Sequence, residues 1–121
     1  MPSDSRLRWI RALAAGVGAE VLTILTIVLA VKVFHANTET AGLVLGAGGG
    51  IVFTFLMALW AAGGVDNRYV LHGLITAIGA VVVHLIGLAG APGGFRPIYA
   101  IADLCKLIAG TIAGVVVSRR R

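Results

Sequence analysis

The stretch TAGLVLGAGGGIVFTFLMALWAAGGV, residues 40–65, contains no charged residue across 26 positions. An α-helix rises about 1.5 Å per residue, so a run of this length can cross the roughly 30 Å hydrocarbon core of a bilayer. Backbone polar groups in hydrocarbon must be bonded within the segment that carries them. The stretch therefore predicts a transmembrane helix.

Three further apolar runs surround this stretch. Residues 12–33 and 97–117 hold two charged side chains each, and residues 69–95 hold none. The links between the runs are short and rich in helix breakers, which makes neighbouring helices antiparallel. None of the runs alternates polar and apolar residues as a barrel strand does. The sequence predicts an all-α fold, an integral membrane four-helix bundle of antiparallel up-and-down topology, as a single domain over residues 1–121 with helices at about 12–33, 42–62, 69–89 and 97–117.

The composition excludes a water-soluble globular domain. Apolar residues make up 59% of the chain and charged residues only 12%, and the mean hydropathy is +0.99. Four crossings of about 20 residues leave no length for a separate soluble domain. The first run, at 22 residues with an acid near its middle, is also unlike the shorter apolar core of a secretory signal peptide.

Basic residues set the expected orientation. The ten Lys and Arg residues outnumber five acids, but they flank apolar runs and do not form the long basic face that nucleic acid binding needs, so no nucleic acid partner is expected. The first and third links carry only two of them. Since cytoplasmic segments are enriched in Lys and Arg, we expect a multi-pass protein of the cell (inner) membrane with both termini cytoplasmic. Seven basic residues form this cytoplasmic flank: Arg6, Arg8, Arg11, Arg68, Arg119, Arg120 and Arg121.

Glycine is abundant, with 17 residues in the chain. In membranes, small residues spaced four apart let helix backbones approach closely. The spacing predicts helix packing at Gly42, Gly46, Gly50, Gly110 and Gly114. The alternative for residues 46–50 is an unwound segment that lines a substrate cavity, as in the broken helices of transporters.

Four ionisable side chains fall at membrane depth, where such groups are costly unless paired or hydrated. Asp103 and Lys106 are three residues apart and share a helix face, and helix rise places Glu20 and His84 at similar depths. We therefore expect an intramembrane polar cluster of Glu20, His84, Asp103 and Lys106. One interpretation is an interhelical clamp that fixes which faces meet. The other is a proton- or cation-coupled site.

No sequence motif for catalysis, phosphate binding or zinc is present. We expect no enzymatic activity, no cofactor and no metal. The expected partners are the lipid bilayer and either further copies of the chain or another protein of a membrane complex. The primary hypothesis is a non-enzymatic membrane component whose polar cluster is structural. The alternative is a proton-coupled small-molecule or cation transporter that uses Glu20.

Two segments carry a resemblance to a known family. AAGGVDNRYVLHGLITAIGAVVVHLIG (residues 61–87) and LCKLIAGTIAGVVVS (residues 104–118) resemble small, uncharacterised four-span bacterial membrane proteins of the YrzE-like type. Those proteins share a glycine-rich second helix, a His-Gly near the start of the third helix and a small-residue last helix. Here His72 with Gly73 matches the second of these features. The resemblance implies the four-span fold and no assigned activity.

A second segment, AGVGAEVLTILTIVLAVK (residues 15–32), resembles the first helix of the small multidrug resistance transporters. In that family a first-helix glutamate is the proton and drug site, which implies that role for Glu20. The aromatic residues and the Trp-x-Gly pattern of the later helices are absent, and Asp103 and Lys106 are foreign to the family. Only Glu20 carries over from this resemblance.

Overall fold

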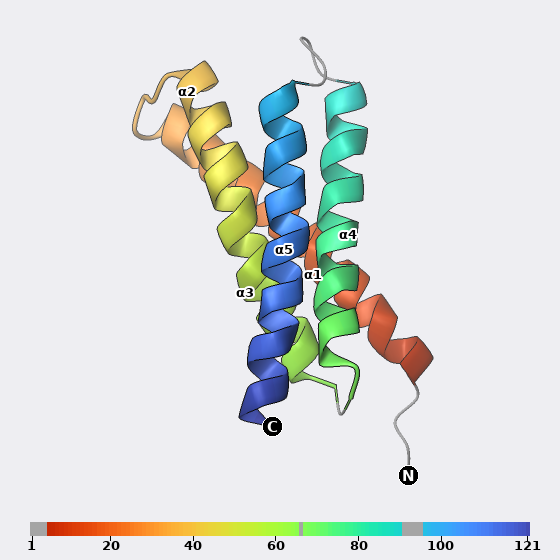
Figure 1. The fold of residues 1–121 in the computed structure, drawn as a ribbon. Coiled ribbons are helices and arrows are strands. Elements are labelled where there is room, and N and C mark those ends of the chain that lie inside the picture. The colour runs from red at the N-terminus through yellow and green to blue at the C-terminus, as the bar shows by residue number, and fades with distance from the viewer. Residues whose placement is uncertain (1–4, 66, 91–95) are drawn as a thin grey trace.

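The computed structural model describes residues 5–65, 67–90 and 96–121, with side chains described from residue 8 onward. Within these residues the chain is helical apart from its connecting segments (Figure 1). The second membrane crossing is not a regular α-helix throughout. One six-residue stretch within it is π-helical, with hydrogen bonds that span five residues. The elements in chain order are α1 (Ser5–Lys32), α2 (Thr38–Leu43), the π-helical η1 (Val44–Gly49), α3 (Gly50–Gly63), α4 (Tyr69–Ala89) and α5 (Pro97–Arg120).

Four helical segments of the described chain are long and apolar enough to cross a membrane, namely Arg8–Lys32, Thr38–Gly63, Tyr69–Ala89 and Pro97–Arg120. The second of these is the continuous run of α2, η1 and α3. In Figure 1, α4 and α5 lie side by side and antiparallel, and the start of α1 and the end of α5 lie at the same end of the bundle. The predicted all-α four-helix bundle is confirmed, and the chain is a multi-pass membrane protein.

The helices extend beyond the apolar runs from which they were predicted. α1 begins at Ser5 and α5 continues to Arg120, because hydropathy marks the part of a helix that suits hydrocarbon and polar residues can prolong the helix on either side. The second crossing begins at Thr38, four residues before the predicted start. Asn37 caps it, since its Oδ1 accepts hydrogen bonds from the backbone N–H groups of Glu39 and Thr40 at 3.0 and 3.2 Å.

Close helix contacts are made by small residues. A Cβ atom on Gly110 in α5 would lie 2.5 Å from the carbonyl oxygen of Gly73 in α4, and one on Gly16 in α1 would lie 2.7 Å from the backbone nitrogen of Ala80. The contact between α4 and α5 and the contact between α1 and α4 therefore both require glycine. Such close approaches bring the helix backbones into van der Waals contact. In lipid this packing stabilises helix association, because the hydrophobic effect that holds soluble helices together is absent there.

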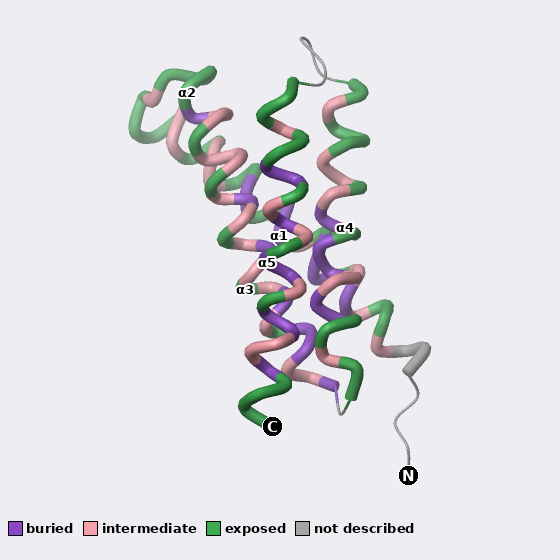
Figure 2. The backbone as a smooth tube through the Cα atoms, in the orientation of Figure 1, coloured by how far each residue is buried: buried purple, intermediate pink, exposed green. Residues whose placement is uncertain are grey.

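Burial is unequal along the bundle. Buried residues gather in the middle and toward the end where α1 starts and α5 ends, as Figure 2 shows. No residue of α1 after Thr23 and none of α4 after Ala80 is buried. We call the end where α1 starts and α5 ends the basic end, because Arg11, Arg68 and Arg121 lie there, and we call the opposite end the far end. The helices pack less tightly toward the far end.

Candidate functional site

A buried ion pair joins the first and last helices. Lys106 Nζ donates a hydrogen bond of 2.6 Å to Glu20 Oε1. Lys106 is 1% exposed and Glu20 is 4% exposed, so the pair is buried within the bundle. Gly50 in α3 makes room for the lysine, since a Cβ there would lie 2.8 Å from Lys106 Cε. Three helices thus meet at one ammonium group.

A second polar contact continues from the same lysine. Asp103 Oδ1 lies 3.4 Å from Lys106 Nζ and 2.7 Å from His84 Nδ1. Asp103 Oδ2 is buried and has no hydrogen-bond partner. The ring of Tyr99 lies edge-on to the His84 imidazole, with ring centroids 5.5 Å apart and an interplanar angle of 88°.

All four residues that the sequence places at membrane depth therefore meet in one chain of contacts, from Glu20 through Lys106 and Asp103 to His84. These side-chain contacts connect α1 to α5 and α5 to α4. With both carboxyl groups ionised and a neutral imidazole, two negative charges face one positive charge. The cluster then carries one net negative charge inside the membrane-spanning region.

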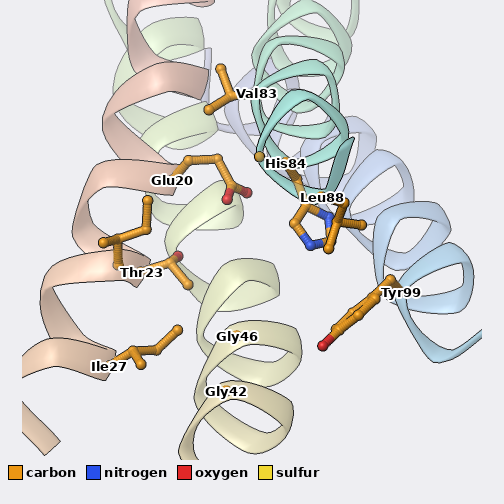
Figure 3. Close-up of a pocket in the computed structure, with 11 residues that line it drawn as sticks. Glu20, Thr23, Ile27, Gly42, Gly46, Val83, His84, Leu88 and Tyr99 are labelled. Atoms are coloured by element: carbon orange, nitrogen blue, oxygen red, sulfur yellow. The ribbon is translucent and has the colours of Figure 1, made fainter. Parts of the chain in front are cut away.

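A cavity of about 360 Å³ lies next to this cluster. Figure 3 shows Glu20 and His84 facing it from α1 and α4, and the Tyr99 hydroxyl facing it from α5. Apolar side chains and glycines form most of the wall. The lining residues are Glu20, Thr23, Ile24, Ile27, Gly42, Gly46, Val83, His84, Gly87, Leu88 and Tyr99.

The five glycines predicted to pack helices serve two different surfaces. Gly110, Gly114 and Gly50 lie in tight contacts; a Cβ on Gly114 would come within 2.5 Å of the Tyr69 carbonyl oxygen. Gly42 and Gly46 instead line the cavity. A Cβ on Gly42 would meet nothing within 4 Å, and one on Gly46 would make an ordinary 3.7 Å contact with Ile27.

A π-helical turn separates Gly42 from Gly50. Residues 44–49 are wound differently from the helices on either side, and the bundle is loosely packed at their level. The expectation of close packing at Gly42 and Gly46 is therefore corrected. The cavity-lining alternative for the glycine segment agrees with the position of Gly46, although the segment stays helical and is not unwound.

The predicted cytoplasmic flank lies at the basic end. Arg11 is half-buried: its guanidinium carbon sits 3.6 Å from the Trp60 ring centroid, and its Nη2 donates to the Trp60 carbonyl oxygen at 2.9 Å. Arg121 donates to the Gly63 carbonyl oxygen and lies over the Tyr69 ring. The remaining members differ in exposure, since Arg8 is half-buried, the side chain of Arg6 lies outside the described part, and the exposed ones are Arg68, Arg119 and Arg120.

Among the cavity-lining residues that the sequence did not predict, Tyr99 and Gly87 lie near His84. Tyr99 in the first turn of α5 reaches the cavity beside His84. Gly87 lies three residues after His84 and lines the same cavity. The helical spacing of His84 and Gly87 is the signal that would have placed them on one face.

Among the described residues, no group of three or more His, Cys, Asp or Glu side chains is arranged to hold a metal ion. Comparison with protein-family models, with curated proteins and with solved structures finds no match to this chain. The geometry of the cluster and its cavity is therefore the basis for assigning a function.

Proposed function

We propose that this protein is a non-enzymatic integral membrane component whose polar cluster holds the four helices in register. The observation that carries the proposal is the 2.6 Å contact between Lys106 Nζ and Glu20 Oε1, made by two buried residues. An isolated charge in hydrocarbon costs several kcal/mol, and pairing offsets part of that cost. The pair therefore favours the one arrangement of helices that brings the two charges together.

The remaining contacts support the same role. Asp103 and His84 extend the cluster from α5 to α4, and Gly50 contributes space from α3. A slip of one helix by a single turn would move a partner by about 5.4 Å. Such a slip would leave a buried charge without its partner, so the cluster is suited to select against it.

The clamp is tested by replacing Glu20 with Gln. Lys106 would lose its counter-ion at 2.6 Å while the volume of the side chain is kept. We expect a lower yield of folded protein and a broader size-exclusion profile in mild detergent than for Lys32→Gln, a control at an exposed position near the end of α1. A Glu20→Gln protein that purifies as a stable species identical to the parent would contradict the proposal.

We also propose a location in the cell (inner) membrane with both termini in the cytoplasm, in agreement with the resemblance to YrzE-like bacterial proteins. The basic residues at one end of the bundle support this orientation. Single cysteines placed at Ser118 and at Arg96, in a Cys105→Ala background, test it with a membrane-impermeant maleimide. On intact cells we expect labelling of Arg96→Cys alone, and labelling of Ser118→Cys alone would overturn the orientation.

Self-association, or assembly with another membrane protein, belongs to the same proposal. Large apolar side chains lie exposed along all four crossings, which leaves apolar faces for lipid or for a neighbouring helix. Light scattering coupled to size exclusion in detergent distinguishes an oligomer from a monomer. A strictly monomeric protein over a wide concentration range would remove self-association and leave the heteromeric complex.

One observation favours a second candidate, a proton-coupled small-molecule or cation carrier. The cavity of about 360 Å³ lies beside Glu20 and His84 and falls within the size range of small-ligand sites. In liposomes with an imposed pH gradient, the carrier should drive flux of a cationic substrate that Glu20→Gln abolishes while the protein stays folded. If the Glu20→Gln variant loses both its fold and its flux, the result supports the clamp. If the parent protein shows no flux, the carrier is rejected.

A further inference from the structure

The orientation of His84 is set by its neighbour. Nδ1 of the imidazole lies 2.7 Å from Asp103 Oδ1. An ionised carboxylate only accepts hydrogen bonds, so Nδ1 carries the proton and donates it to Asp103. In the neutral ring the second nitrogen, Nε2, then holds a lone pair and acts as an acceptor.

This second nitrogen is available to the cavity. The described residues provide no hydrogen-bond partner for Nε2, and it is not among the buried unpartnered atoms. The His84 side chain is 20% exposed, and it lines the cavity. Figure 3 shows the imidazole directed into the space bounded by Glu20, Leu88 and Tyr99.

Glu20 is less available than His84, although both face the cavity. Its Oε1 is bonded to Lys106 Nζ at 2.6 Å, so the lysine already offsets the charge of the carboxylate and only Oε2 is left for a ligand. Of these two cavity-lining side chains, His84 on α4 is the more exposed, at 20% against 6% for Glu20. A ligand needs a donor group to use the acceptor Nε2 of His84.

The charge of the surroundings selects the kind of donor. With both carboxyl groups ionised and the imidazole neutral, Glu20 and Asp103 outnumber Lys106 by one charge, and Asp103 Oδ2 is buried without a partner. A positively charged ligand offsets that excess, whereas an anion adds to it. The rest of the wall, from Ile24 and Ile27 to Val83, is apolar and suits a short hydrocarbon chain.

We propose that the cavity binds a small protonated alkylamine, whose ammonium group donates to His84 Nε2 and whose hydrocarbon chain packs against α1, η1 and α4. Asp103 is a positioning residue in this site, because it holds the imidazole with Nε2 toward the ligand. At about 360 Å³ the cavity is near the lower limit of ligand pockets, which favours a short chain. The site supplies a ligand for the carrier considered above, but it requires only binding and not transport.

The test uses the full chain in phosphatidylcholine nanodiscs, with the histidine imidazoles labelled by ¹⁵N and the His84 signals assigned from a His84→Gln sample. The probes are hexylammonium, 1-hexanol and hexanoate, which share a chain length and differ in charge. We expect hexylammonium to shift the His84 Nε2 resonance saturably, and the other two probes to bind at least tenfold more weakly. Equal shifts from 1-hexanol, or no saturable shift with hexylammonium, would overturn the proposal.

Two matched variants separate the cavity from nonspecific partition into lipid. Gly42 and Gly48 both have open space around an added Cβ, but only Gly42 lines the cavity. Gly42→Leu should weaken hexylammonium binding at least tenfold, and Gly48→Leu should leave it unchanged. Equal binding to both variants rejects the site. If hexylammonium binds but the liposomes show no Glu20-dependent flux, the binding site is retained and the carrier is rejected. If flux occurs without a response of the His84 resonance, the carrier is retained and the binding site is rejected.

Discussion

Replacing Lys106 with Met removes the ammonium group that lies between two carboxylates. Its Nζ is 2.6 Å from Glu20 and 3.4 Å from Asp103, and the residue is 1% exposed. In the parent cluster two acids face one base, so the net charge is one negative. The Lys106→Met substitution changes the net charge of the cluster from one negative to two negative. Removing one partner of a buried ion pair typically costs about 3–5 kcal/mol, and we expect a loss of stability of this size.

The double variant Glu20→Met, Lys106→Met identifies the source of that loss. It restores the parent net charge, because one acid and one base are removed together. Replacement of a whole buried pair by apolar side chains is often close to neutral. We therefore expect the double variant to be more stable than Lys106→Met alone by about 2 kcal/mol or more, the excess left by an unpaired buried acid.

The measurement is the free energy of unfolding in mixed dodecylmaltoside and SDS micelles, followed by tryptophan fluorescence. Lys32→Met serves as the control for loss of a lysine at an exposed site, and it should change stability by no more than about 0.5 kcal/mol. If Lys106→Met costs less than about 1 kcal/mol, or if the double variant is as unstable as the sum of the single ones, the buried pair does not hold the bundle together.

Three further predictions concern packing and the basic end. Gly73→Ala should cost about 1–3 kcal/mol in the same unfolding assay, because its Cβ would meet the backbone of α5, whereas Gly87→Ala in the same helix should be tolerated. Gly50→Leu should displace Lys106 and lower the thermal unfolding temperature by more than Gly87→Leu does. Arg11→Gln should cost about 1 kcal/mol through loss of the cation–π contact with Trp60, and an unchanged melting temperature would contradict that contribution.

Hydropathy predicts the number and approximate limits of the four crossings, because the bilayer imposes length and composition directly on the chain. It does not predict that α1 begins at Ser5, since helix formation by the flanking residues does not depend on hydrocarbon. Charge patterning and helix rise were enough to expect that Glu20, Asp103 and Lys106 share one layer. The pairing of each acid was beyond the sequence, because it depends on how the helices rotate about their axes.

The cavity was the least predictable feature. It arises where the helices pack loosely, and its wall combines side chains from α1, α2, η1, α4 and α5. Residue spacing indicates which positions share a face within one helix, but not where two helices fail to touch. The same limit explains why Gly42 and Gly50 looked equivalent in sequence and differ in the structure.

The π-helical segment Val44–Gly49 also adjusts the phase of the second crossing. Each residue of an α-helix turns about 100° around the axis, and a wider turn accommodates one extra residue without lengthening the helix in proportion. The segment therefore acts as a phase shift between Gly42 and Gly50. Deletion of a single residue within it would let the crossing rewind as a regular α-helix while Gly42 and Gly50 keep nearly their present relative orientation. Winding the undeleted segment as a regular α-helix would instead rotate Gly42 by about 100° relative to Gly50. The extra residue thus sets the angle between the face that carries Gly42 and the face that carries Gly50.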